Sequence, residues 1–162
     1  MNMNKKFTQG FTLIELIVVI GIIGVLTTIV LSSLDQSKAK SRDNRRVQDI
    51  ATITLALENY YNDHRSYPQN FGSNRFIPDY LPVELVDPST KGDYLYVGID
   101  PISDGCRAYH IGATLELTSS RLNPDSNANF NSKTTTSTRC PNGYPPEGFD
   151  GSGMVYDMIS KY

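Results

Sequence analysis

A single carboxylate, Glu15, lies inside an otherwise apolar segment near the start of this 162-residue chain. Residues 11–34 include sixteen Phe, Leu, Ile or Val residues. Together they favour membrane insertion by about 5 to 9 kcal/mol, whereas one central acid costs about 3 kcal/mol. The segment is therefore expected to insert despite Glu15. An acid in hydrocarbon needs a cationic partner, because an unpaired buried charge is costly, so Glu15 is the first candidate functional residue.

The length of this segment separates three kinds of membrane signal. As a helix, residues 11–34 would measure about 36 Å, enough to cross a hydrocarbon core of about 30 Å with some tilt. A secretory signal peptide usually has an apolar region of about 7 to 15 residues before a small-residue site. Here the segment is longer and is followed by Asp35-Gln36-Ser37-Lys38. A plain signal anchor fits the length but leaves Glu15 without a role.

Cleavage between Gly10 and Phe11 would supply the missing cation, because the new α-amine of Phe11 lies one helical turn from Glu15. A short leader with Lys5 and Lys6 precedes this junction. In these residues the chain resembles the type IV prepilin family, which includes the pseudopilins of type II secretion and the pilins of DNA-uptake systems. The resemblance implies that a prepilin peptidase cuts after Gly10 and N-methylates Phe11. It also implies that Glu15 is the assembly carboxylate, which meets the Phe11 ammonium of a neighbouring subunit.

The resemblance implies an α+β pilin fold and a structural role without enzymatic activity. The chain would be a subunit of a type IV pilus-like filament. The subunit would first be held in the cytoplasmic membrane with its head outside the cytoplasm, and would then polymerise. Its partners would be further copies of itself, the peptidase, a membrane assembly platform and minor pilins. Basic residues on both sides of the segment would by themselves place the head in the cytoplasm, but two cysteines suit an oxidising exterior. A major pseudopilin of type II secretion is the alternative, and a signal-anchored binding domain or enzyme is a lower one.

A long helix is predicted from residue 11 to about residue 62. Neither proline nor glycine interrupts residues 25–67. Residues at spacings of three and four predict one buried face; they are Val47, Ile50, Ile53, Thr54, Leu57, Tyr60, Tyr61 and His64. Residues 1–10 are then the leader, 11–34 the membrane and assembly half of the helix, 35–65 its amphipathic half, and 66–162 the head. The charged block 35–49 is interpreted as a solvated face or, as the resemblance favours, as a surface against neighbouring subunits.

A small antiparallel sheet is predicted in the head. Residues 93–99 and 106–117 alternate in polarity on either side of the turn at 100–105, as in a hairpin. In the second run, the odd-numbered positions from Arg107 to Leu117 share the apolar side, which puts His110 on the other side. Residues 154–159 could add a third strand. Prolines at 68, 78, 82 and 88 indicate an extended connection before the hairpin.

Two cysteines, Cys106 and Cys140, flank the Ser-, Thr- and Asn-rich segment 119–139. The segment has little to bury and is expected to be a long surface excursion. In an exported domain an even pair of cysteines usually forms a disulfide. Closing this loop would stabilise the fold by about 3.8 kcal/mol in the chain-entropy model. Free buried thiols and a metal pair are the alternatives.

A possible calcium site follows from residues near the C-terminus. Residues 149–157 resemble, in position and composition, the calcium loop of major pseudopilins, and Asp150, Ser152 and Asp157 could supply the hard oxygen ligands that calcium prefers. The spacing is not that of an EF-hand, and Asp-Gly is equally a turn signal. The structural role requires no cofactor, so calcium is an additional expectation.

Neither catalysis nor nucleic-acid binding is favoured by the remaining residues. His64 lies on the predicted helix stripe, and the sequence has no Gly-x-Ser-x-Gly motif, metal-spaced histidine pair or phosphate loop. From Ser66 onward, seven Lys and Arg residues face eleven Asp and Glu residues, a formal net charge of −4. A nucleic-acid-binding face is normally basic. No nucleic acid is therefore expected to bind the isolated head.

Overall fold

The computed structural model describes residues 10–71, 76–102, 105–117, 130–133, 139–140, 145 and 148–160, with the backbone alone at positions 29, 30, 32 and 33. The chain forms two compact units, Met1–Lys38 and Ala39–Tyr162. The predicted leader, with Lys5 and Lys6, lies almost entirely outside the described residues, as does most of the predicted excursion at 119–139.

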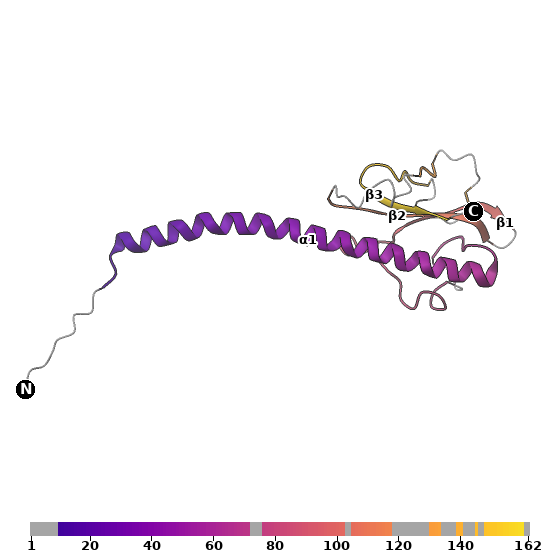
Figure 1. Cartoon of the computed structure of the whole chain (residues 1–162), viewed down its shortest axis with the longest axis horizontal. Helices are drawn as coiled ribbons and strands as arrows, with labels where there is room; N and C mark the ends of the chain where they lie inside the picture. Colours follow the sequence, from indigo (N-terminus) through magenta and orange to yellow (C-terminus); the bar gives the residue numbers. More distant parts are fainter. Residues whose placement is uncertain are drawn as a thin grey trace, which may run out of the picture. The chain divides into compact units, whose positions relative to one another are not determined.

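One helix, α1, runs from Leu13 to His64 and is drawn in indigo to magenta in Figure 1. The prediction of a single long helix is confirmed, with each end shifted by about two residues. In the first unit its apolar side chains are exposed, including Leu13 at 76% and Ile14 at 70%. Among the residues whose side chains the structure describes, no helix meets the length and apolarity needed to cross a membrane.

The C-terminal end of α1 is set by backbone geometry. Arg65 has a φ of 56° and donates its N–H to the carbonyl of Tyr61. Tyr67 then pairs with Cys106 in an isolated bridge. Because Pro68 disfavours helical geometry in the residue before it, the chain leaves the helix here and reaches the sheet of the head.

The sheet has three antiparallel strands in the order β1-β2-β3: Leu95–Ile102, Gly105–Thr114 and Val155–Ile159. Tyr96 lies opposite Ile111, and Ala113 lies opposite Tyr156. The predicted hairpin and third strand are both confirmed, and with α1 they give the predicted α+β class.

The core of the head forms between α1 and one face of this sheet. Ile50, Ile53 and Leu57 are fully or almost fully buried, as the helix stripe predicted. They belong to one apolar cluster with residues of the hairpin and its connections, including Tyr67, Phe76, Tyr96, Tyr109, Ile111 and Leu115. Burying large side chains from both elements supplies the main driving force for this packing.

The second face of β2 is also buried, which corrects the predicted one-sided pattern. His110 is fully buried, whereas Arg107, predicted on the apolar side, is exposed. Residues around Phe130 and Phe149 cover this face, and the rings of Phe149 and His110 stack with centroids 3.8 Å apart. Gly112 permits this cover, because a Cβ there would lie 2.8 Å from the Phe149 ring. Strict alternation fails here because both faces of the strand pack against protein.

Candidate functional site

The predicted assembly carboxylate, Glu15, caps the start of α1 in the structure. Thr12 precedes the first helical residue, and its carbonyl accepts the N–H of Leu16 at 3.3 Å. The Glu15 N–H donates to Thr12 Oγ1 at 3.3 Å, and the Thr12 backbone N–H donates back to Glu15 Oε2 at 3.5 Å. The Thr12 hydroxyl also donates to Glu15 Oε2, at 3.3 Å. This reciprocal arrangement is a capping box. Glu15 therefore has a partner within its own chain, besides any partner in an assembly.

The predicted cleavage junction lies just before this cap. Gly10 and Phe11 are in no helix or strand, and Phe11 is 83% exposed. The junction is thus exposed, and no helical hydrogen bond holds it among the described residues. Cleavage after Gly10 would create the α-amine of Phe11 next to Thr12. This is the end of the helix where four backbone N–H groups lack helical partners.

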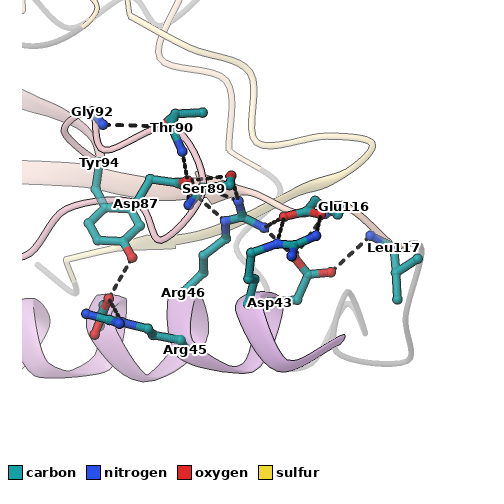
Figure 2. Close-up of polar contacts among 12 residues, drawn as sticks. Asp43, Arg45, Arg46, Asp87, Ser89, Thr90, Gly92, Tyr94, Glu116 and Leu117 are labelled. Carbon is teal, nitrogen blue, oxygen red and sulfur yellow. Dashed lines mark hydrogen bonds and ion pairs between the residues drawn. The ribbon is translucent and has the colours of Figure 1, made fainter. Parts of the chain in front are cut away.

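Inside the head, the guanidinium of Arg46 has all five of its N–H donors occupied (Figure 2). Nε donates to Asp87 at 2.6 Å; Nη1 donates to Asp43 at 2.7 Å and Glu116 at 2.8 Å; Nη2 donates to Asp87 at 3.1 Å and Ser89 at 2.6 Å. Its side chain is only 3% exposed. We call Arg46, Asp43, Asp87 and Glu116 the Arg46 network.

The carboxylates of the Arg46 network also hold backbone groups. Asp43 accepts the N–H groups of Glu116 and Leu117, both at 2.9 Å. Asp87 Oδ1 accepts the N–H groups of Ser89 and Thr90, both at 2.8 Å. The network therefore ties together three segments: α1, the turn after Asp87, and the chain just beyond β2.

The pKa values within the network favour the ionised forms. Burial alone would raise the pKa of Asp87, but hydrogen bonds from Arg46 and from the Thr90 and Ser89 N–H groups outweigh it and hold that pKa well below the usual range. A hydrogen bond from Arg42 is the main cause that lowers the pKa of Glu116 to about 2. Hydrogen bonding to Asp87 raises the pKa of Arg46 despite burial. Arg46, Asp87 and Glu116 are therefore charged at neutral pH.

The network corrects the interpretation of residues 35–49. This block was expected to be solvated or to face neighbouring subunits, yet the Asp43 and Arg46 side chains are at most 4% exposed. Arg45, which lies between Asp43 and Arg46 in the sequence, has a side chain that is 61% exposed. The expectation is therefore wrong for the two residues that face the head, because their partners come from distant parts of the sequence.

The two cysteines form the predicted disulfide, Cys106–Cys140, with Cα atoms 6.3 Å apart. The free-thiol and metal-pair alternatives are therefore wrong. Cys140 donates its N–H to the Gly98 carbonyl at 2.9 Å, and Arg139 forms a bridge with Ile99. Residues 139–140 are thus held beside β1 by backbone contacts and are joined to β2 by the disulfide.

The predicted calcium ligands have different surroundings. Asp157 is fully buried; its Oδ2 accepts the Phe130 N–H at 2.9 Å and contacts His110 Nε2 at 2.8 Å. Asp150 is exposed and accepts the Ser152 N–H at 2.9 Å. Among the described residues, no group of three or more His, Cys, Asp or Glu side chains is suited to a metal ion. The calcium site stays a prediction from the sequence.

The N-terminal geometry agrees with a comparison against protein families. Residues 5–31, which include Gly10, Phe11 and Glu15, match the family model of the prokaryotic N-terminal methylation motif. The chain carries the prokaryotic N-terminal methylation motif. The resemblance predicted from these residues is confirmed.

The chain is also similar to curated proteins of two kinds. The type II secretion system core protein G of Aeromonas hydrophila is 39% identical over 66 residues, which cover 41% of this chain and 46% of that protein. Its Escherichia coli K12 counterpart is 43% identical over 60 residues, 37% of this chain and 41% of that protein. A probable minor fimbrial protein of Dichelobacter nodosus is 37% identical over 73 residues, 45% of each chain.

These matches span less than half the length of the curated relatives. No solved structure matches the chain significantly.

Several residues of these sites were not predicted from the sequence. The capping role of Thr12 was signalled by its spacing from Glu15, since Thr-x-x-Glu is the pattern of a capping box. The turn after Asp87 was signalled by the Asp-Pro-Ser-Thr run. Arg46 and Glu116 carried no local signal, because their pairing joins residues 70 positions apart.

Proposed function

We propose that this chain is a structural, non-enzymatic subunit of a helical filament, cut after Gly10, N-methylated at Phe11 and polymerised through its N-terminal helix. The observation that carries the proposal is the methylation motif at residues 5–31, whose cleavage junction is exposed immediately before α1.

The exposed apolar surface of the first unit supports this proposal. Apolar side chains from Leu13 to Leu26 are between 47% and 76% exposed. A continuous apolar surface of this kind is unfavourable in water and marks a membrane or protein contact. We propose that the cytoplasmic membrane covers it before assembly and that neighbouring helices cover it in the filament, with the head outside the cytoplasm.

The proposed role of Glu15 is to pair with the Phe11 ammonium of a neighbouring subunit. Opposite charges attract strongly where water is excluded, and either one left alone there is costly. In the free subunit the capping box gives Glu15 a local partner at Thr12. Assembly would then replace a weak exposed contact by a charge pair, and this favours subunits in the correct register.

Type II secretion is the more specific candidate for the filament's role. The relatives from Aeromonas hydrophila and Escherichia coli are both named as core proteins of that system. The match to a minor fimbrial protein keeps a surface pilus as the second candidate. In either case the proposed partners are other copies of the chain, a prepilin peptidase, an assembly platform and minor pilins.

The experiment that tests this function is Glu15→Ala in the full chain, with Glu84→Ala as control because Glu84 is an exposed acid of the head. Cleavage after Gly10 should persist in both variants, since neither change alters the junction. Filament yield should fall sharply only for Glu15→Ala. Equal filament yields from both variants would contradict the assembly role of Glu15.

A further inference from the structure

The head's contact with α1 begins with charged residues. The second unit starts at Ala39, and the first buried side chains of α1 within it belong to Ala39, Asp43 and Arg46. The large apolar side chains of the helix stripe follow, from Ile50 onward. At the end of this contact nearest the N-terminus, the Arg46 network therefore lies between the small buried residue Ala39 and the large apolar side chains that begin at Ile50.

Hydrogen bonds of a guanidinium impose a geometry that apolar contacts do not. Apolar packing is non-directional, whereas the planar fork of arginine presents its donors at fixed angles. Arg46 uses its five donors on four side chains from three segments. A rotation or slip of this part of α1 would break several of these bonds together, so only one placement of the helix satisfies them.

We propose that Arg46 is a positioning residue for filament assembly, which fixes one placement of residues 39–50 of α1 against the turn after Asp87 and the chain at Glu116 and Leu117. This inference rests on the proposed function. In a filament built through the N-terminal helix, the location of each head depends on how the head holds α1. An undocked segment would let heads occupy several positions, and neighbouring subunits would no longer fit a single helical lattice.

A purely general stabilising role makes a different prediction from a positioning role. If Arg46 only adds stability, its loss lowers the protection of every amide in the head that exchanges by global unfolding. If it positions the helix, loss of Arg46 opens residues 39–50 locally and leaves the hairpin of β1 and β2 protected. Hydrogen exchange separates these outcomes, because it reports the opening free energy of each segment.

The test uses the full chain with Arg46→Met, which keeps an unbranched apolar stem and removes the fork. Arg45→Met is the matched control, since Arg45 is the adjacent residue of the same helix, is 61% exposed and lies 3.7 Å from Asp49. Asp87→Asn is the second variant, because it keeps the size of the side chain while removing one charge from the network. Arg46→Lys tests whether charge alone is enough.

In detergent micelles, Arg46→Met should speed amide exchange in residues 39–50 by about a hundredfold, since breaking a buried pair is strongly destabilising. Asp87→Asn should act in the same direction, Arg46→Lys should rescue only in part, and Arg45→Met should match the wild type. In cells, Arg46→Met should reduce filament yield while processing after Gly10 stays normal.

Three results would overturn the inference: unchanged exchange in residues 39–50, an equal increase throughout the head in both Arg46→Met and Asp87→Asn, or wild-type filament yield from Arg46→Met. Failure of the proposed function gives a separate result. In that case the wild-type chain itself is neither cut after Gly10 nor polymerised, while the exchange experiment still reports whether Arg46 holds the helix.

Discussion

Gly98 makes room for the disulfide, and this gives a prediction whose size follows from the structure. A Cβ built at Gly98 would lie 2.3 Å from Cys106 Sγ and 3.1 Å from Cys140 Cβ. Ordinary contacts to a Cβ begin at 3.4 Å. Gly98→Ala therefore requires the cystine or strand β1 to move by roughly 1 Å, which is an overpacking change with a cost of about 1 to 3 kcal/mol.

Opening the disulfide would not relieve this clash at lower cost. The two cysteines are 34 residues apart, and the chain-entropy model assigns such a loop about 3.8 kcal/mol. This exceeds the overpacking cost, so the bond should stay closed and the strain should remain in the native state. The melting temperature of the head is then expected to fall by about 5 to 10 °C.

The assay is a double-mutant cycle on a fragment that begins at Ser37, followed by thermal unfolding. Gly98→Ala is measured with the disulfide intact and in a Cys106→Ala, Cys140→Ala background. Without the sulfur atoms the alanine should cost at least about 1 kcal/mol less, which is a measurable coupling energy. Gly92→Ala is the control, because its Cβ would meet only Thr90 Oγ1, at 3.6 Å. Equal costs of Gly98→Ala in both backgrounds would refute the reasoning.

Two further predictions concern pH and calcium. Because the pKa of Glu116 is lowered from 4.5 to about 2, its ionic contribution is complete above pH 4.5 and is lost as the pH falls toward 2. The melting temperature should fall across that window, with a shallower slope in Glu116→Gln, and identical slopes would exclude Glu116 as a cause of the fall. If Asp150, Ser152 and Asp157 help to hold calcium as the sequence suggested, millimolar calcium should raise the melting temperature relative to chelator, and Asp150→Ala should abolish the rise. Coincident curves would leave only the turn between Asp150 and Ser152.

The helix, the hairpin and the disulfide could be predicted because each depends on a local or paired signal. Spacings of three and four placed Ile50, Ile53 and Leu57 on one buried face, and alternation with a central turn gave β1 and β2. A pair of cysteines left few other arrangements. In these elements local preference and tertiary packing agree, so the pattern and the structure coincide.

The Arg46 network and the burial of His110 could not be predicted, because each depends on segments far away in the sequence. A charged block such as 35–49 is usually solvated. The sequence around Arg46 gives no signal that Asp87 and Glu116 contact it in the fold. His110 was placed on the open side of β2 because alternation assumes one exposed face. Segments near Phe130 and Phe149 cover that face. This packing is a tertiary contact that no periodic pattern in the sequence predicts.

Intact-mass spectrometry of the protein from membrane and filament fractions decides whether the chain is a processed filament subunit. We expect one mature species that begins at Phe11 and carries a single N-terminal methyl group, because Gly10 and Phe11 lie within the motif at residues 5–31. A mature chain that begins at Met1, or one cut after Leu34 as by a signal peptidase, would show that it is not processed in this way.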